Sequence, residues 1–321
     1  MVRYAARRLF ATILVVLAVS LATFLLIHLV AGDFVPGLKL VPHLSAGDID
    51  RIRTNLGLNE PVYQQFLTWQ LRILTLNLGN SLVDGTPVST LIAERLGATI
   101  LLVGTAIMVG LLVAIPLGVL QAVRAQSVFD NVTSAAVAVG YSIPPFWLSL
   151  VAILVFSVLF QEWGLPSLPS SGDQTPFDGS VPDRMVHLLL PALVLSFGYI
   201  ATWSRFVRSS MLEVLSSDYV RTARAKGMRE SRVVWLHALR NALLPLITMV
   251  SLELPGLISG AAVIEIVFGW PGIGQLAFNR ALQYDYTTVL GITMFVTILV
   301  LVANFLADIA YMVANPRIRL T

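Results

Sequence analysis

The sequence predicts an all-α, polytopic membrane protein with about six transmembrane helices. Two observations predict this class. The first is composition: 56% of the 321 residues are hydrophobic and only 12% are charged, with a mean hydropathy of +0.81, whereas soluble domains carry about 25% charged residues. The second is that the chain contains apolar runs long enough to cross the hydrocarbon core of a bilayer, which takes about 20 helical residues.

The apolar runs are 9–30, 98–122, 132–160, 186–204, 246–268 and 289–313. The first follows Arg3, Arg7 and Arg8 and so resembles a secretory signal. A signal has an apolar core of about 7–15 residues, and this run is longer, so we expect a retained first span. The third run contains Pro144-Pro145, and we expect it to kink there.

The basic residues set the expected orientation. The pI of about 9.4 could indicate nucleic-acid binding, but the net charge is only +3 and the basic residues lie between apolar runs. If the N-terminus is inside, 14 of the 21 Lys and Arg residues lie in inner segments, as the positive-inside rule requires. Both termini are therefore expected to be cytoplasmic. The inner residues are Arg3, Arg7, Arg8, Arg124, Arg205, Arg208, Arg221, Arg224, Lys226, Arg229, Arg232, Arg240, Arg317 and Arg319.

This orientation divides the chain into four parts. Residues 1–30 form a cytoplasmic N-terminus and first span, 31–97 an extracytoplasmic segment, 98–313 a transmembrane core and 314–321 a cytoplasmic tail. The outer segment contains an amphipathic stretch, Glu60–Leu74. The outer loop 161–185 is rich in Pro, Ser, Gly and Asp and is expected to be irregular. The cytoplasmic segment 205–245 is amphipathic and basic, which is typical of ordered helices rather than a tether.

Within 205–245 the pattern predicts two helices joined by a turn. Asp218 can cap the first helix and Ser231 the second. Gly227 follows a lysine and can adopt the left-handed conformation that ends a helix. Pro245 is expected to open the next span.

The first of these helices has two features suited to contact with another surface. Ala223 and Ala225 are small, so a partner can approach closely, and basic residues form a rim: Arg221, Arg224 and Lys226. The residues alone leave two interpretations open, a basic hairpin resting on anionic lipid headgroups or a protein-docking element.

The run Tyr219-Val-Arg-Thr-Ala-Arg-Ala-Lys-Gly227, with Pro245 eighteen residues later, resembles the EAA loop of ABC-importer permease subunits. The likeness is greatest to the dipeptide/oligopeptide/nickel family. Gly32-Asp33, Leu56-Gly-Leu58, Glu265–Gly274 and Asn315–Arg319 add weaker similarity, so the resemblance covers nearly the whole chain. The chain departs from the family pattern at Thr222, where an acidic residue names the loop, and at Asn315, where aspartate is usual.

The resemblance implies a fold like that of type I ABC-importer permeases, in the bacterial cytoplasmic membrane. The loop would be the ATPase-coupling helix, formed by Tyr219, Val220, Arg221, Thr222, Ala223, Arg224, Ala225, Lys226 and Gly227. The chain would be a non-catalytic subunit that translocates di- or oligopeptides, with nickel or another small solute as the alternative. The implied partners are a homologous second permease, two cytoplasmic ATPases and an extracytoplasmic binding protein. ATP and Mg would be bound by the ATPases, and this chain would bind no cofactor.

Three residues are candidates for the translocation pathway: Pro144, Glu253 and Glu265. A carboxylate within a span costs about 2.5–3.5 kcal/mol on insertion scales, so Glu253 should face water or the bundle interior. It could meet substrate or only form an interhelical hydrogen bond. Glu265 could simply reach the outer interface, and for Asp308 a structural pairing is the preferred interpretation.

Several function classes find little support. The chain has no cysteine, its four histidines share no ligand spacing, and we expect no metal site. Gly269–Gly274 is glycine-rich, but no Gly-Lys-Ser/Thr phosphate loop occurs, and a turn with Trp270 at the interface is expected instead. The motifs of intramembrane serine and aspartyl proteases are missing. A secondary transporter would show inverted repeats and several intramembrane charges, and neither is clear.

Overall fold

The computed structural model describes residues 2–31, 47, 54, 59–75 and 77–314, and in this part the chain is helical, with one isolated β-bridge between Asn80 and Pro87. It forms two compact units. The described residues up to Gly97 and those from Gly272 to Leu306 make the first, and Ala98–Pro271 make the body of the second. Within the described residues, four helical stretches are long and apolar enough to cross a membrane: Val88–Val123, Pro145–Glu162, Val181–Leu215 and Tyr286–Phe305. The span count of six therefore stays a prediction.

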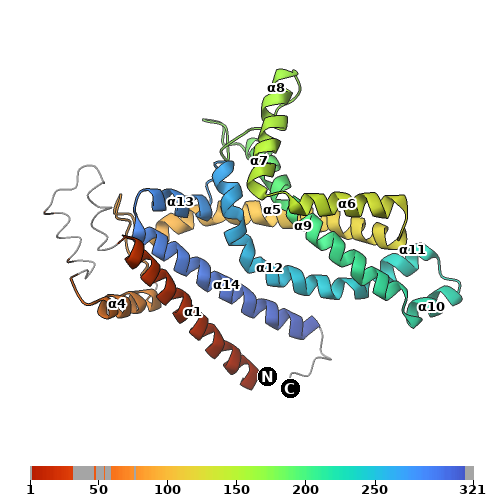
Figure 1. The fold of residues 1–321 in the computed structure, drawn as a ribbon, viewed down its shortest axis with the longest axis horizontal. Helices are drawn as coiled ribbons and strands as arrows, with labels where there is room; N and C mark the ends of the chain where they lie inside the picture. The colour runs from red at the N-terminus through yellow and green to blue at the C-terminus, as the bar shows by residue number, and fades with distance from the viewer. Residues whose placement is uncertain (1, 32–46, 48–53, 55–58, 76, 315–321) are drawn as a thin grey trace. The chain divides into compact units, whose positions relative to one another are not determined.

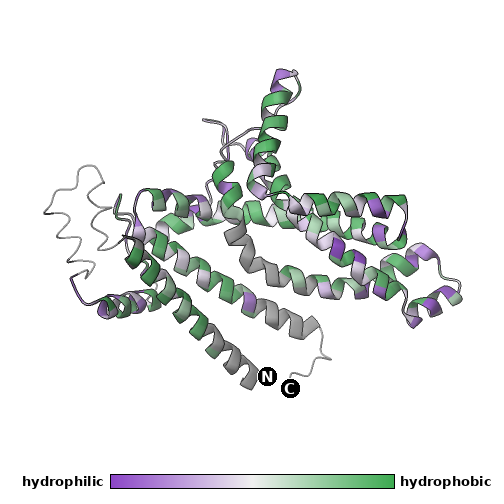
Figure 2. Ribbon diagram, in the orientation of Figure 1, coloured by the Kyte–Doolittle hydropathy of each residue, from purple (hydrophilic) through white to green (hydrophobic). Residues whose placement is uncertain are grey.

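The second unit contains most of the core. Its elements are the C-terminal part of α5 (Val88–Val123), α6 (Val128–Ser142), α7 (Pro145–Ile153), the π-helix η1 (Leu154–Leu159), α8 (Phe160–Glu162), α9 (Val181–Leu215), α10 (Asp218–Ala225), α11 (Glu230–Arg232), the π-helix η2 (Val233–Ala238) and α12 (Leu239–Val267). Serine caps start two of them: Ser127 accepts a hydrogen bond from the Asp130 amide at α6, and Ser180 one from the Asp183 amide at α9. Hydrophobic residues run along α5, α6 and α7, and hydrophilic ones gather at α10 and α11 (Figure 2).

The third apolar run does more than kink. α6 ends at Ser142, and Ile143 and Pro144 are extended, with ψ of 122° and 134°. α7 then starts at Pro145 and rises steeply from the end of α6 (Figure 1). Two consecutive prolines remove two amide donors, and the residue before a proline avoids the helical region. The expected kink is thus a complete break.

α9 is the central helix of this unit, in contact with α6, α7 and α12. Its residues Trp203, Val207 and Met211 are completely buried in a cluster that includes Ala114 and Val119 of α5. The close approach depends on glycine: a Cβ on Gly118 would lie 2.6 Å from the carbonyl oxygen of Ser204. Small residues let membrane helices pack closely.

The first unit is built from α1 (Val2–Ala31), α4 (Val62–Leu74), the start of α5, α13 (Ile273–Leu282) and α14 (Tyr286–Ala314) as far as Leu306. α4 confirms the amphipathic stretch expected at Glu60–Leu74. A buried cluster joins Val88 and Ile92 of α5 to Ile273 and Leu276 of α13 and Ile292 of α14. The irregular loop expected at 161–185 is confirmed between α8 and α9, where turns and bends occupy most of the chain, but α9 already starts at Val181.

Candidate functional site

The hairpin at α10 and α11 differs from expectation in its caps. Ser217 rather than Asp218 is the N-cap of α10, and Asp218 is its first residue, 3.7 Å from Arg221. Arg229 precedes α11, so Ser231 is not a cap. Pro245 does not open a span either, because α11, η2 and α12 form one uninterrupted helical run from Glu230 to Val267. The expectation that these residues mark element boundaries is wrong; the hairpin joins directly to the long helix that follows it.

The turn itself is as expected. Gly227 has φ of +73°, in the left-handed region. Its amide donates to the Arg224 carbonyl at 2.9 Å, and the next amide, of Met228, donates to the Ala223 carbonyl at 3.4 Å. These two bonds make a Schellman motif, in which the residue after the C-cap is usually glycine. No atom lies within 4 Å of a Cβ built on Gly227, so the backbone conformation alone selects glycine here.

A bidentate ion pair closes the hairpin across this turn. Arg224 donates from Nε and Nη2 to the two carboxylate oxygens of Glu230, at 3.1 and 2.6 Å. The hydrogen bond from Arg224 lowers the pKa of Glu230, and burial opposes this only in part. Arg224 is therefore engaged within the hairpin and is not a simple member of a cationic rim.

One face of α10 is anchored to the protein. Val220 and Ala223 are buried in the same cluster as Val233, Val234 and Ala238 of η2, and the Tyr219 hydroxyl accepts a hydrogen bond from Asn241 at 2.9 Å. Ala223 therefore permits close packing inside the chain, contrary to the expectation that it faces a partner. The other residues of the run are exposed: Tyr219, Arg221, Thr222, Arg224, Ala225, Lys226 and Gly227.

Sequence reasoning missed a second ion pair, between α9 and α6. Arg208 donates from Nε and Nη2 to the carboxylate of Asp130, both at 2.7 Å, and Asp130 also accepts from the Gln126 amide at 2.9 Å. Asp130 is 2% exposed. The hydrogen bond from Arg208 holds the pKa of Asp130 well below its ordinary value, against the opposing effect of burial. No spacing signal could have revealed the pair, since 78 residues separate its members.

The three pathway candidates lie in different settings. Pro144 is exposed and helps line an open, apolar groove of about 600 Å³ with Val139, Phe146 and Trp147. Glu265 is completely buried near the end of α12, where it accepts a hydrogen bond from Thr99 at 2.7 Å, so the idea that it simply reaches the interface is wrong. Glu253 belongs to α12, but its side chain lies outside the described residues, as does that of Asp308.

The glycine-rich turn after α12 is also buried rather than interfacial. Trp270 is 1% exposed, and its indole N–H donates to the Ala98 carbonyl at 2.9 Å. Gly269 has φ of +59°, and the Gly172 amide donates to the Phe268 carbonyl, which ties the loop after α8 to this turn. Trp270 was expected at the membrane interface, and that expectation is wrong because its only polar atom has an internal partner.

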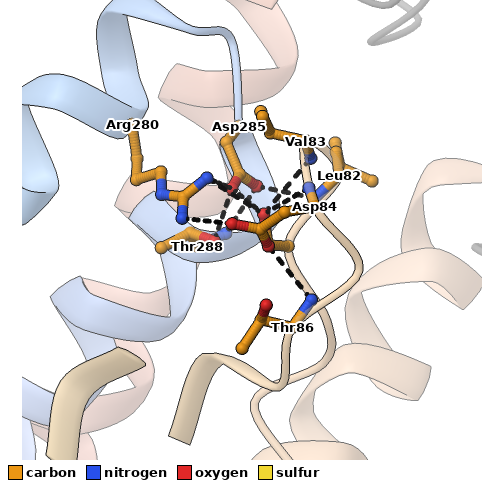
Figure 3. A network of polar contacts seen from close by, with 8 residues as sticks. Leu82, Val83, Asp84, Thr86, Arg280, Asp285 and Thr288 are labelled. Carbon is orange, nitrogen blue, oxygen red and sulfur yellow. Dashed lines mark hydrogen bonds and ion pairs between the residues drawn. The ribbon is translucent and has the colours of Figure 1, made fainter. Parts of the chain in front are cut away.

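Figure 3 shows a polar network in the first unit, which sequence reasoning also missed. The carboxylate of Asp285 is completely buried, caps α14 through the Thr288 amide and accepts hydrogen bonds from Ser81 and the Leu82 amide at 2.6 and 3.0 Å. Arg280 lies between Asp285 and Asp84, 3.7 and 2.6 Å away. Burial raises the pKa of Asp84, but the Arg280 hydrogen bond and those from Thr86 outweigh it, and the pKa is well below its usual range. The network fastens the loop before α5 to the turn before α14.

Within the described residues, no group of three or more His, Asp or Glu side chains could hold a metal ion. The candidate site is the exposed face of α10, which lies between α9 and the helical run from Glu230 to Val267. Comparison with known protein families identifies the family of the chain. Residues 114–320 match the model of the binding-protein-dependent transport system inner membrane component, and residues 1–103 match the N-terminal model of the same kind of membrane component.

The chain belongs to this family.

Members of this transport-system family are similar to the chain over its whole length. This chain is 40% identical over 320 residues to the oligopeptide transport system permease protein AppB of Bacillus subtilis (strain 168), and the alignment covers 99% of each chain. It is 36% identical over 341 residues to the dipeptide transport system permease protein DppB of Escherichia coli (strain K12), again covering 99% of each. The resemblance noted from residues 219–227 is thereby confirmed, and the chain is an integral membrane component without catalytic function of its own.

A solved structure supports the fold. The MetNI methionine ABC transporter in an inward-facing conformation has a chain that matches with a TM-score of 0.56 at 20% identity, over 70% of this chain and 96% of that one. At this identity the likeness concerns the fold alone. It confirms the all-α, importer-permease architecture expected from the sequence.

Proposed function

We propose that this chain is a permease subunit of an ATP-driven importer that moves di- or oligopeptides across the bacterial cytoplasmic membrane. The similar proteins AppB and DppB are permeases of oligopeptide and dipeptide transport systems, which favours peptides over nickel. The proposed partners are a homologous second permease, two cytoplasmic ATPases that bind ATP and Mg, and an extracytoplasmic binding protein. Both termini are cytoplasmic in this proposal, because 14 of the 21 basic residues then lie inside.

The observation that carries the proposal is the way in which the hairpin is built. α10 is separated from α9 only by Ser216 and Ser217, and the helical run from Glu230 continues into α12. Val220 and Ala223 hold α10 on that run, while the opposite face stays exposed. A partner that pushes on α10 must therefore move the ends of α9 and α12 together, because packed helices transmit displacement with little compression.

The Asp130–Arg208 pair extends this coupling to α6. α6 leads to the break at Ile143 and Pro144, where the extended backbone can absorb a change of angle between α6 and α7. The apolar groove lies at this break. In the proposed mechanism, closure of the ATPases moves the hairpin, α9 carries that motion to α6, and the bend beside the groove opens or closes the pathway.

The test exploits the left-handed turn. Gly227→Val should lose ATPase binding and peptide uptake, because a β-branched residue strains at φ of +73° and the hairpin must rearrange. Gly227→Asn is the matched control, since asparagine tolerates this region and should keep both activities. Exposed Arg229→Ala should have much less effect. Co-purification of the ATPases and uptake of a labelled peptide would be measured in the same membranes. Full docking and uptake by Gly227→Val would contradict the coupling role.

A further inference from the structure

Helix α4 carries an exposed apolar stripe. Tyr63, Leu67, Leu71 and Leu74 are 66%, 57%, 65% and 79% exposed, and their spacing of three and four residues places them along one side of the helix. Thr68, also exposed, lies on the neighbouring polar side. A contiguous apolar surface of this kind marks a contact with protein or membrane.

The adjacent face of α4 is attached to α1. Phe24 of α1 packs against the rings of Phe66 and Trp69, with centroids 5.4 and 5.8 Å away. Gln70 donates a hydrogen bond to the hydroxyl of Ser20. Both Phe24 and Ser20 are buried by this contact, so the point at which α4 meets α1 is well defined.

The contact point sets the depth of α4 in a bilayer if α1 spans it, as the proposed function requires. The apolar run of α1 starts after Arg8, and about 20 residues cross the hydrocarbon, which places the far boundary near His28. At about 1.5 Å per residue, Phe24 lies about 6 Å and Ser20 about 12 Å inside that boundary. Amphipathic helices insert their apolar face about 5–10 Å into the boundary between headgroups and acyl chains.

We propose that α4 is an interfacial helix embedded in the outer leaflet, with its exposed stripe in contact with lipid acyl chains. On α1, Leu21 and Leu25 lie at the same depth as the contact with α4 and are also exposed. The exposed leucines of α1 at this depth contact lipid if α1 spans the membrane, and the stripe of the attached helix α4 is therefore expected to contact lipid as well. All backbone groups inside α4 are helical, as insertion among acyl chains demands. This part of the segment 31–97 is then membrane-embedded rather than wholly extracytoplasmic.

Single-cysteine variants can test the placement cleanly, because the chain has no native cysteine. Nitroxide labels would be attached at Leu67→Cys, Leu71→Cys and Thr68→Cys, and at Leu17→Cys in the middle of α1. Each variant would be assembled with its partner subunits in phospholipid vesicles that still take up peptide. Oxygen dissolves in the bilayer and a nickel chelate stays in water, so the two relaxation agents report the two environments.

We expect the labels at Leu67 and Leu71 to relax with oxygen and to be insensitive to the chelate, as at Leu17. The label at Thr68, one residue away, should respond to the chelate. Chelate sensitivity at Leu67 would overturn the proposal, and so would shielding from both agents, which would show that a protein covers the stripe. A label at Leu17 that does not respond to oxygen would also overturn it by showing that α1 is not a span, whereas peptide uptake tests the transport function independently.

Discussion

At the scale of single residues, the structure separates cations that hold the hairpin together from cations that are free to meet a partner. Arg224 is committed to Glu230 by two hydrogen bonds. Lys226 and Arg221 lie on the exposed side, with Arg221 only loosely paired to Asp218 at 3.7 Å. Arg221 and Lys226 are thus better candidates for contact with an ATPase than Arg224.

Reversing the Arg224–Glu230 pair distinguishes the two roles. Glu230→Arg places like charges together and should open the hairpin, lowering ATPase co-purification. The pair is half-exposed, so the loss in stability should be at most about 1 kcal/mol. The double variant Arg224→Glu with Glu230→Arg should restore co-purification, because the ion pair reforms in the opposite sense. If Arg224 instead contacts the ATPase, the double variant would bind as poorly as the single one.

The Asp130–Arg208 pair predicts a pH dependence. Because the folded-state pKa of Asp130 lies below its ordinary value of 3.8, its stabilisation is fully present above that value and is lost as pH falls through the folded-state pKa. Asp130→Asn should therefore lower the thermal midpoint of the solubilised transporter at pH 7, and the difference from wild type should shrink below about pH 3.8.

The expected loss for Asp130→Asn at pH 7 is about 3 kcal/mol, at the lower end of the range for breaking a buried pair, because the Arg208 side chain is 31% exposed. Arg205→Gln, which changes an exposed residue of the same helix, is the control and should have little effect. An unchanged midpoint for Asp130→Asn at pH 7 would show that the pair contributes no stability.

At the scale of the elements, close helix packing depends on particular glycines. A Cβ on Gly118 would lie 2.6 Å from the Ser204 carbonyl oxygen and 2.7 Å from the Cβ of Val207, whereas a Cβ on Gly104 would meet nothing within 4 Å. Both glycines belong to α5, so they share the same intrinsic helix preference. The contact partner at Gly118 includes backbone, which cannot rotate away.

The matched substitutions Gly118→Ala and Gly104→Ala should have opposite effects. Gly118→Ala should destabilise the protein by about 1–3 kcal/mol, the usual cost of overpacking. Gly104→Ala should be neutral or stabilising by up to about 1 kcal/mol, because alanine is the better helix former. Thermal unfolding in detergent would measure both. Equal shifts for the two variants would mean that α5 and α9 are not in close contact at Gly118.

At the scale of the whole molecule, the proposed transport function requires side chains that meet the peptide along the pathway. Glu253 lies within the continuous helix that leaves the hairpin, and we propose that it lines the pathway. Glu253→Gln should then reduce peptide uptake more than it reduces the amount of assembled transporter. Glu265→Gln is the comparison, since Glu265 is buried against Thr99 and its loss should act mainly on assembly. Normal uptake by Glu253→Gln at normal membrane levels would leave Glu253 with a structural role.

The sequence by itself determined the class of the protein, its family and the turn at Gly227. Whether a segment crosses the membrane depends on its own length and hydrophobicity. Composition and the apolar runs are therefore sufficient to indicate the class. The left-handed turn is equally local, because a lysine followed by glycine at a helix end is sufficient to indicate it. Local patterns also indicated α4 and the weak point at Pro144, although not the full break that the structure shows there.

Only the tertiary structure decided which polar residues are paired and which faces are free. Asp130 contacts Arg208, 78 residues away in the sequence, and Asp285 contacts Ser81, 204 residues away. No local sequence pattern indicates contacts between residues so far apart in the chain. For the same reason Ala223, Glu265 and Trp270 were expected at surfaces but are buried, since burial depends on which helix lies opposite. The continuity of α11, η2 and α12 through Pro245 was likewise visible only in the structure, because propensity alone places a helix boundary at a proline.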